Sequence, residues 1–291
     1  MRVHLLDGTY ELFRHYYGAP RRHDREGREV GAIVGLLGSV LGMLEGDTTH
    51  LGVATDHVIE SFRNDLWPGY KTGEGIEPEL WAQFHPLEDA LRAMGVVVWA
   101  MEKFEADDAL ASAAHLAAQD PAVEQVVICT PDKDLSQCVR GRRVAQLDRR
   151  RREIRDEEGV VKRFGVGPAS IPDYLALVGD SADGFPGVPG WGEKAAATVL
   201  GRYGHLEEIP ASAAEWDVSV RGAARLSAAL EADRERAMLF RTLATLRTDA
   251  PLFTAVDELR WRGPTPRFES VAEDLGTVAL WQRARRLQTG A

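Results

Sequence analysis

Acidic residues stand where several short apolar segments of the chain end. Asp7 closes the string VHLLD, and Asp56 closes the string LGVATD. Asp132 and Asp134 follow the string VVICTP. In open α/β sheets the active site forms beyond the carboxyl ends of the strands. If the three apolar strings are strands of one such sheet, their acids converge on the same edge, and the sequence predicts an acidic site there.

A further acidic string, FEADD at residues 104–108, opens a predicted helix after another apolar segment. Glu105 and Asp108 share a face of that helix because they are three residues apart, and Asp107 lies beside them. Carboxylates in one pocket repel each other unless basic groups, protons or cations compensate. Few basic residues other than Lys133 are next to these acids. Oxygen ligands favour hard cations, so we expect two or more Mg²⁺ or Mn²⁺ ions, which activate water and polarise a phosphate.

Each of these acids also has a simpler interpretation when it is taken alone. A single aspartate at a strand or helix boundary commonly caps a helix or forms a turn. Asp107 and Asp108 suit a helix N-terminus, where the macrodipole favours negative charge. Asp132 and Asp134 follow Pro131 and suit a turn. We favour a shared metal site over separate caps because the acids of several segments are expected at one edge.

The apolar pattern predicts an α/β fold with a mostly parallel sheet. Four short segments rich in branched or aromatic residues are expected to be buried strands, namely 3–6, 51–54, 96–100 and 126–129. Helical patterns alternate with them at 31–45, 79–93 and 106–118. Pro86 is expected to bend or split the second helix. Strands that alternate with helices indicate a parallel sheet covered on both faces.

The second half of the chain is predicted to be helical, with candidate helices at 169–178, 193–202, 222–248 and 268–287. We place the domain boundary near residue 160, between a core of residues 1–160 and a helical part of residues 161–291. Residues 64–78 contain three Gly and two Pro and are expected to form a mobile loop or a short arch, which extends to about residue 85.

A Gly- and Pro-rich turn between two predicted helices follows a pair of acids in the string GDSADGFPGVPGWGEKAAA. The acids are Asp180 and Asp183. The turn contains Gly190 and Gly192, and Lys194 follows in the next helix, which is the form of a helix–hairpin–helix motif. Backbone N–H groups at such a helix start can bind a DNA phosphate without reading bases. An ordinary Gly-rich turn between helices is the alternative.

The composition of the 291 residues is that of a globular protein, with 44% hydrophobic and 27% charged residues. No apolar run is long enough for a membrane span or forms a signal segment, and two cysteines fit a reducing compartment, so we expect a soluble cytoplasmic protein. The net charge of −10 argues against general nucleic-acid binding. Acids that bind cations would nevertheless make the total negative while basic patches remain elsewhere.

Together these motifs resemble the 5′ nuclease domain of bacterial DNA polymerase I and the related flap endonucleases. The matching strings, in the family's order and spacing, are LLDGTYELFR, SFRNDLWPGYK, FEADDALA, TPDKDLSQ and LVGDSADGFPGVPGWGEKAAATVL. They cover most of the chain, and the last three are highly specific. The resemblance implies a PIN-like α/β core, with a mostly parallel sheet flanked by helices, and a helix–three-turn–helix DNA-binding region. It also implies a 5′-3′ exonuclease or flap endonuclease that hydrolyses DNA in replication or repair.

The resemblance implies two groups of metal ligands and a monovalent site. The first group consists of Asp7, Asp56, Glu105, Asp107 and Asp132. The second group consists of Asp108, Asp134, Asp180 and Asp183. All nine acids of the family pattern are present, which implies a catalytically competent chain. A K⁺ ion is implied in the hairpin region, held largely by backbone oxygens.

Several basic and turn residues match family positions that face DNA. Arg14, in the first helix, and Lys71, at the base of the arch, match residues that contact the scissile phosphate and act with Asp7 in catalysis. Arg63 and Tyr70 match residues that support or stack on DNA, and the alternatives are a surface ion pair for Arg63 and simple packing for Tyr70. The hairpin residues Gly190, Gly192 and Lys194 are the remaining DNA contacts that the resemblance implies.

The arch departs from the family at Glu74, where a basic residue is usual three positions after the arch lysine, so we expect a weaker hold on phosphate there. The basic run Arg149 to Arg152 is expected on a hairpin between strands, as a solvated surface or as a contact with the duplex backbone. The chain ends at Ala291 with no polymerase domain, so we expect a stand-alone, monomeric nuclease. Its expected partner is flapped, nicked or branched DNA, and no membrane.

Three other functions remain as alternatives. The first is a non-catalytic DNA junction-binding protein of the same fold, against which the complete acid set argues. The second is an aspartyl phosphatase, suggested by the string LDGT, but that chemistry needs an acid where Thr9 stands. The third is an RNA-cleaving PIN-type toxin, although such chains are short and lack the hairpin string. The balance of exonuclease and flap endonuclease activity, the preferred metal and the action on RNA primers stay open.

Overall fold

A computed structural model describes residues 1–289 of the chain. The backbone divides into two compact units, which are described in turn. The sheet unit comprises Met1–Ile59, Gly73–Thr130 and the described part of Thr248–Ala291. The helical unit comprises Glu60–Thr72 and Pro131–Arg247, so the predicted arch contributes to both units. The functional division near residue 160 stays a prediction.

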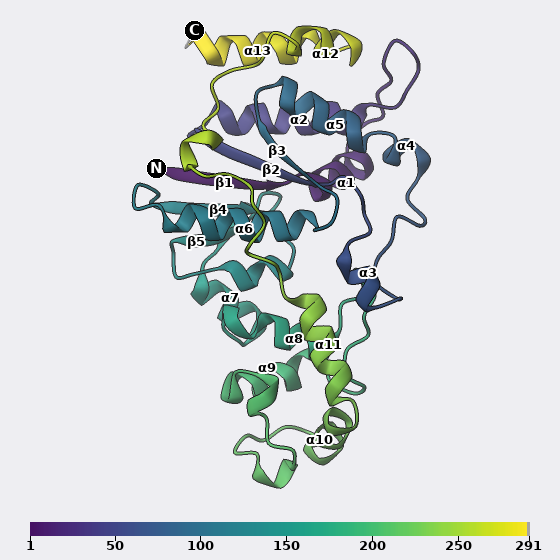
Figure 1. Cartoon of the computed structure of the whole chain (residues 1–291), viewed down its shortest axis with the longest axis vertical. Coiled ribbons are helices and arrows are strands. Elements are labelled where there is room, and N and C mark those ends of the chain that lie inside the picture. Colours follow the sequence, from purple (N-terminus) through teal and green to yellow (C-terminus); the bar gives the residue numbers. More distant parts are fainter. Residues whose placement is uncertain (290–291) are drawn as a thin grey trace. The chain divides into compact units, whose positions relative to one another are not determined.

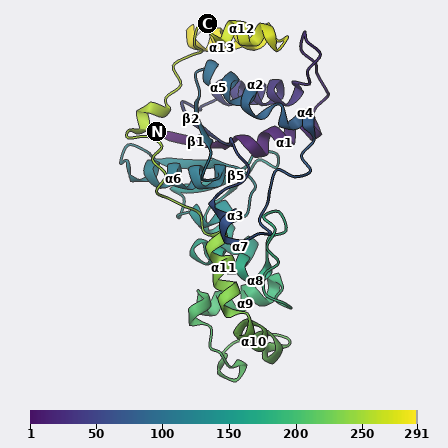
Figure 2. The same cartoon turned by 45° about the vertical axis from the view of Figure 1, so that its right-hand side comes forward.

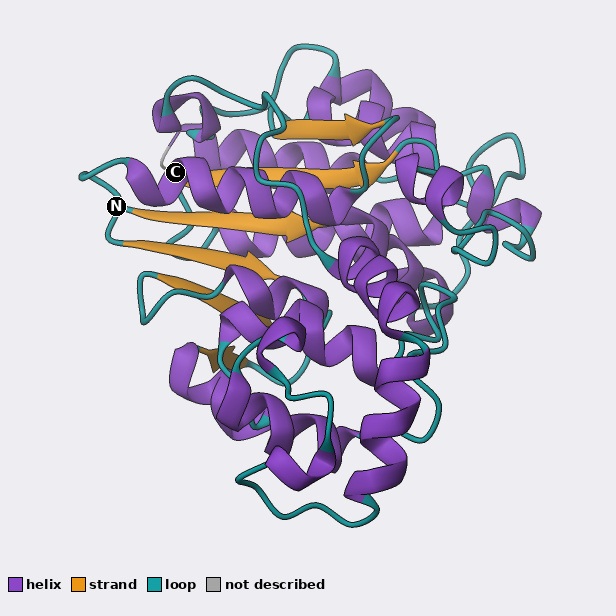
Figure 3. Ribbon diagram, turned by 60° about the horizontal axis from the view of Figure 1, so that its bottom comes forward, coloured by secondary structure: helices purple, strands orange, loops and turns teal. Residues whose placement is uncertain are grey.

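The sheet unit contains four parallel strands in the order β3-β2-β1-β4, drawn as parallel arrows in Figure 3. Their bounds are β1 (Arg2–Asp7), β2 (His50–Asp56), β3 (Val97–Met101) and β4 (Gln125–Cys129). All four predicted strands are confirmed. Strand β1 pairs with both β2 and β4, so the residue that ends it lies between the ends of two neighbours.

Helices cover both faces of this sheet (Figures 1 and 2), with α2 and α5 on one face and α6 on the other. The helices are α1 (Gly8–Gly18), α2 (Gly31–Leu44), α4 (Pro78–Trp81), α5 (Phe84–Ala93), α6 (Ala106–Gln119), α12 (Phe268–Asp274) and α13 (Val278–Thr289). A short 3₁₀ helix, η5 (Val256–Leu259), contacts β2. Helix α2 also packs against α13, which explains why apolar residues occupy so much of its circumference. Within the described residues, no helix is both long and apolar enough to cross a bilayer.

The helix boundaries correct several expectations, among them the single helix expected at 222–248, which the structure divides at Asp233. The pattern at 79–93 is split, but the break falls between α4 and α5, before Pro86. Pro86 lies in the first turn of α5, where the N–H that proline lacks would have had no intrahelical partner. The pattern at 268–287 is likewise split into α12 and α13, and Gly276 between them has φ of +64°. Residues 64–78 are not all loop, because helix α3 (Phe62–Leu66) overlaps their start.

The helical unit begins its second segment with 3₁₀ helix η1 (Asp134–Cys138) and an antiparallel hairpin of β5 (Val144–Asp148) and β6 (Glu153–Arg155). The hairpin predicted around the arginine run is thereby confirmed. The later helices are α7 (Glu157–Phe164), α8 (Ile171–Val178), α9 (Glu193–Tyr203), α10 (Ala223–Ala232) and α11 (Arg234–Ala244). Short 3₁₀ helices complete the unit at Pro168–Ser170, Leu206–Glu208 and Ala213–Glu215.

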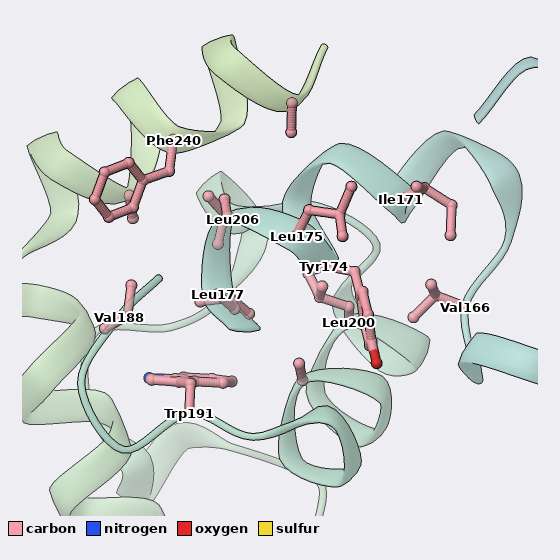
Figure 4. Packing of buried hydrophobic residues seen from close by; sticks show 14 of the residues in the cluster. Val166, Ile171, Tyr174, Leu175, Leu177, Val188, Trp191, Leu200, Leu206 and Phe240 are labelled. Atoms are coloured by element: carbon pink, nitrogen blue, oxygen red, sulfur yellow. The ribbon is translucent and has the colours of Figure 1, made fainter. Parts of the chain in front are cut away.

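Helix α8 is the centre of the hydrophobic core of the helical unit (Figure 4), and it packs against α9 and α11. Leu175 and Leu177 of α8 are fully buried, and Phe240 approaches them from α11. Trp191, in the turn before α9, closes the core, and its indole N–H donates to the carbonyl of Leu226 at 3.1 Å. The turn before α9 is therefore held by packing on the core as well as by its backbone.

Arg63 of α3 is buried in the helical unit, with 1% of its surface exposed. Its Nε donates to the carbonyl of Leu243 at 2.8 Å and its Nη2 to the carbonyl of Thr245 at 3.1 Å. These carbonyls lie at the C-terminal end of α11, where intrahelical partners run out. The arginine therefore ties α3 to the end of α11.

Substitution of Gly8 by alanine should lower the free energy of unfolding by about 1 to 3 kcal/mol, because the core would be overpacked. A Cβ at Gly8 would lie 2.8 Å from the carbonyl oxygen of Ala54 and from the side chains of Val53 and Thr55. Gly18→Ala, at the other end of α1, meets nothing within 4 Å and serves as the control. Urea denaturation measures both variants, and equal stabilities would contradict the prediction.

Substitution of Arg63 by alanine should lower the free energy of unfolding by about 3 kcal/mol or more, because two charge-assisted hydrogen bonds are lost and their buried acceptors remain. The exposed Arg221→Ala in the same unit should change it by less than about 0.5 kcal/mol. Thermal denaturation and DNA-binding titrations of Arg63→Ala and Arg221→Ala test this prediction. Normal stability with weakened DNA binding for Arg63→Ala would show instead that Arg63 faces DNA.

Candidate functional site

Asp7 is the last residue of β1 and the N-cap of α1 in the sheet unit. Its Oδ1 accepts a hydrogen bond from the backbone N–H of Tyr10 at 2.8 Å. Its Oδ2 accepts one from the hydroxyl of Thr130, the residue that follows β4, at 2.9 Å. Two donors on neighbouring elements therefore orient this buried carboxylate at the carboxyl edge of the sheet.

Asp56 ends β2 and joins three elements at the same edge. Its backbone N–H donates to the hydroxyl of Thr9 in α1 at 2.8 Å. Its Oδ1 accepts from the N–H of Ala106, the first residue of α6, at 2.8 Å. The end of β2 is thus tied to the starts of both α1 and α6, as expected for acids gathered where parallel strands end.

The acids of the FEADD string surround the N-terminus of α6. Glu105 is the N-cap, and its backbone N–H donates to Oδ2 of Asp108 at 3.0 Å. Both side chains are buried, and Asp107 between them is half-buried. The capping interpretation therefore holds for Asp7 and Asp108, but it does not compete with metal binding, because a cap orients a carboxylate that a cation can also contact.

In the helical unit, Asp134, Asp180 and Asp183 form a buried group that we call the Asp134 cluster. Each offers a carboxylate oxygen, and these oxygens all lie within 4.8 Å of one another. Asp132 is exposed, and its Oδ1 accepts from the backbone N–H of Asp134 at 3.2 Å, which gives it the turn-forming role. These three acids belong to the second group that the resemblance implies, whereas its fourth member, Asp108, belongs to the sheet unit, and Asp132 of the first group belongs to the helical unit.

The loop after α8 positions two of these acids through a short bridge. Asp180 and Phe185 exchange backbone hydrogen bonds of 2.8 and 3.0 Å, and Oδ1 of Asp180 accepts from the N–H of Ala182. The loop crosses its own start so closely that a Cβ at Gly179 would lie 2.5 Å from the carbonyl carbon of Pro186. Glycine is required for that approach, and φ at Gly179 is +83°.

Two lysines partly compensate the charge of the Asp134 cluster. Nζ of Lys133 lies 2.8 Å from Oδ2 of Asp180, and Nζ of Lys71 lies 3.3 Å from Oδ1 of Asp183. Oδ1 of Asp134 is buried and has no hydrogen-bond partner among the described residues. Burial raises the pKa of Asp134 well above its ordinary value, and the carboxylates of Asp132, Asp183 and Asp180 raise it further. A bound cation would compensate the remaining negative charge.

The pKa of Lys133 reflects the same surroundings. Burial lowers it, but the hydrogen bond with Asp180 and the charges of the nearby aspartates outweigh burial, so the pKa is raised overall.

Lys133 also lines a cavity of about 460 Å³ with Arg163 and Gly192. Gly192 is the N-cap of α9, and Lys194 is exposed in the first turn of that helix. Gly190 has φ of +84°, which suits a tight turn.

Arg14 is held by a neighbour on its own helix that was not expected from the sequence. Its guanidinium donates to the buried carboxylate of Glu11, three residues earlier on α1, and contacts Nε2 of His15 at 3.0 Å. The three-residue spacing was the available signal for this pair. Thr130, which donates to Asp7, was also missed, although it lies in the string TPDKD.

Two residues expected to face DNA are enclosed instead. Arg63 is the buried link described above, so it does not lie on the surface. Tyr70 belongs to the hydrophobic core of the helical unit and is 3% exposed, which matches the packing alternative. Both support the segment that carries Lys71.

Glu74 is exposed, and Arg150 to Arg152 are exposed at the tip of the β5-β6 hairpin, as a solvated surface requires.

Models of known protein families match both parts of the chain. One described as 5′-3′ exonuclease, N-terminal resolvase-like domain, matches residues 2–165. Another, described as 5′-3′ exonuclease, C-terminal SAM fold, matches residues 166–267. Among curated proteins, DNA polymerase I of Pseudomonas aeruginosa is 37% identical over 259 residues, which are 88% of this chain and 28% of that protein. The chain thus spans less than a third of the length of that relative.

Two solved structures share the fold over nearly the whole chain. T5 5′-exonuclease, described with bound divalent metal ions (zinc), has a TM-score of 0.64 at 16% identity and is covered over 99% of both chains. The catalytic core of Rad2 in complex with DNA substrate has a TM-score of 0.62 at 14% identity, covering 98% of this chain and 90% of that one. These likenesses confirm the predicted fold class. Because the two family models together match residues 2–267, the chain belongs to the 5′-3′ exonuclease family.

Proposed function

We propose that this protein is a divalent-metal-dependent 5′ nuclease that hydrolyses DNA phosphodiester bonds at 5′ ends, flaps and branched or nicked duplexes, in replication or repair. The observation that carries the proposal is the Asp134 cluster, three buried carboxylates with oxygens within 4.8 Å of one another, in a chain of the 5′-3′ exonuclease family. Membership alone gives the class of reaction, and the cluster supplies the chemical means for it.

The donor set suits Mg²⁺ or Mn²⁺. All ligands on offer are carboxylate oxygens, which hard divalent cations prefer, and no thiolate or imidazole belongs to the cluster. The buried Oδ1 of Asp134 without a hydrogen-bond partner is the kind of atom that a cation would satisfy. Bound divalent ions lower the pKa of water and polarise a phosphodiester. Asp7, Asp56, Glu105, Asp107 and Asp108 offer the same chemistry within the sheet unit.

The chain's own residues supply orientation and charge. Thr130 and the N–H of Tyr10 hold the carboxylate of Asp7, and the N–H of Ala106 holds that of Asp56. Arg14 and Lys71 would offset the charge that grows on phosphate oxygens in the transition state, a role whose removal costs roughly 100- to 1,000-fold in rate. Lys71 is now paired with Asp183, so substrate would have to draw it away.

We also propose that the turn between α8 and α9 binds the duplex. Gly190, Gly192 and Lys194 would hold backbone phosphates at the N-terminus of α9, where N–H groups lack intrahelical partners. A K⁺ ion held by backbone oxygens would stabilise the same turn. In this proposal residues 1–160 perform the cleavage, with an arch near 64–85, and residues 161–291 position the DNA.

Asp7→Ala should lower the rate of cleavage of labelled 5′-flap DNA by more than about 100-fold in Mg²⁺ or Mn²⁺, because loss of a ligand should exceed the 10- to 100-fold cost of losing a residue that supports a ligand. DNA binding, measured by fluorescence anisotropy in EDTA, should stay the same or strengthen. Asp7→Asn keeps a capping oxygen for α1, so a similar loss of cleavage in this variant would show that the loss does not come from unfolding of the helix.

Asp47→Asn is the matched control for Asp7, since Asp47 is an exposed acid of the same unit that pairs with Arg2. It should cleave at the wild-type rate. Normal cleavage by Asp7→Ala would overturn the site. A wild-type protein that binds flap DNA but leaves it intact in both metals would instead be a non-catalytic junction-binding protein.

Asp134→Asn should stabilise the metal-free protein at neutral pH. The pKa of Asp134 is raised in the folded state, so the folded protein keeps a proton that the unfolded chain loses near pH 3.8. The contribution of Asp134 to the free energy of unfolding therefore falls as the pH rises from about 3.8 to the raised pKa of the folded state, and it stays low above that pKa. Saturating Mg²⁺ should reverse the order and favour the wild type. Thermal denaturation from pH 4 to 8, with and without metal, measures this, and a pH-independent difference would contradict it.

A further inference from the structure

A single buried carboxylate holds both residues that flank Asp56. Oε1 of Glu88, on α5, accepts from the hydroxyl of Thr55 at 2.8 Å. Oε2 of the same residue lies 2.8 Å from Nδ1 of His57, which donates to it. Glu88 is 2% exposed, so these contacts are shielded from water. The two oxygens of one side chain thus clamp the chain on either side of Asp56.

The alternation of side chains along a strand explains why this clamp acts on Asp56. Residues one before and one after a strand position point to the face opposite to it. Thr55 therefore points toward α5 and Asp56 away from it, and His57, the residue after the strand, also reaches Glu88. Oδ1 of Asp56 meets the N–H of Ala106 at the start of α6, which lies on the other face of the sheet. Glu88 thus holds both neighbours of Asp56 in the chain.

Further contacts hold the clamp itself in place. The ring of His57 stacks on that of His85 with 4.0 Å between centroids and an interplanar angle of 11°. Nε2 of His85 lies 3.1 Å from the backbone carbonyl oxygen of His57. Arg92, one turn after Glu88, lies 3.7 Å from its Oε2 and balances its charge. Helix α5 therefore contacts the end of β2 and the residue after it through Glu88 and His85, and Arg92 pairs with Glu88.

We propose that Glu88 is a positioning residue for the metal-binding carboxylate of Asp56, acting through Thr55 and His57. The inference rests on the proposed function to the extent that Asp56 is a ligand there. Without the clamp, residues 55 to 57 lose their side-chain contacts with α5 but keep others, among them those with Thr9, Ala106 and the backbone of Met101. The carboxylate of Asp56 would then sample more orientations, and the cation would bind less tightly.

The test compares Glu88→Ala, Glu88→Gln and Asp89→Asn by isothermal titration with Mn²⁺ in the absence of DNA. Losing the partner that orients a ligand typically weakens metal binding 10- to 100-fold, and we expect this for Glu88→Ala. Glu88→Gln, with one acceptor oxygen in place of two, should be intermediate. Asp89→Asn changes an exposed neighbour on the same helix and should bind Mn²⁺ as the wild type does.

Cleavage of 5′-flap DNA over a range of Mg²⁺ concentrations supplies a second readout. Glu88→Ala should need 10- to 100-fold more Mg²⁺ for half-maximal rate and should approach the wild-type rate at saturation. A merely structural loss would instead lower the rate at every metal concentration and lower the melting temperature in proportion. If Glu88→Ala does not fold, Thr55→Val, which removes one donor of the clamp, takes its place in both measurements.

The outcomes separate this inference from the proposed function. Mn²⁺ binding by the Glu88 variants that equals binding by the wild type and by Asp89→Asn overturns the positioning role and leaves the nuclease proposal intact. A wild type that binds Mn²⁺ but cuts no DNA overturns the nuclease proposal, while the titrations still decide the role of Glu88. A wild type that binds no Mn²⁺ overturns both.

Discussion

Repulsion between carboxylates that are withdrawn from water governs how both groups of acids are built. Interaction between like charges grows as the surrounding dielectric falls, so buried acids are tolerated only where opposite charge or donors are supplied. In the sheet unit, N–H and O–H donors of Tyr10, Thr130 and Ala106 stabilise the carboxylates of Asp7 and Asp56. In the helical unit the opposite charge comes from the ammonium groups of Lys71 and Lys133, and these leave the pKa of Asp134 raised by burial and by its neighbours.

The carboxylates that cap helices in the sheet unit are also proposed metal ligands. Asp7 begins α1, and Asp108 closes the start of α6, so each fold element depends on an acid that also faces the carboxyl edge of the sheet. The orientation of these carboxylates follows in part from the helix geometry, and the hydroxyl of Thr130 adds a second donor for Asp7. Glu88 adds a different kind of support, since it acts on the strand end from the opposite face.

The strands and the acid positions were predictable because both follow from local patterns. Strands buried on two faces are continuous apolar runs, and acids just after them lie at one edge whatever the details of packing. Helix α7 was missed although Asp156 caps it and Gly165 ends it in the left-handed conformation, since its apolar residues are few. Arg63 and Tyr70 could not be assigned from a Gly- and Pro-rich segment, because their burial depends on α11 and α8, more than 100 residues away.

The ion pairs of Lys71 and Lys133 make these side chains rivals of any ion that enters the Asp134 cluster. A divalent ion could bind only if the carboxylates gave up their contacts with the ammonium groups. The affinity for the ion would therefore depend on how much more strongly the carboxylates attract the ion than the lysines. Both ammonium groups are partly exposed and can swing outward, where dissolved salt screens them. A divalent ion that binds there would therefore compete with two lysine side chains for the same carboxylates.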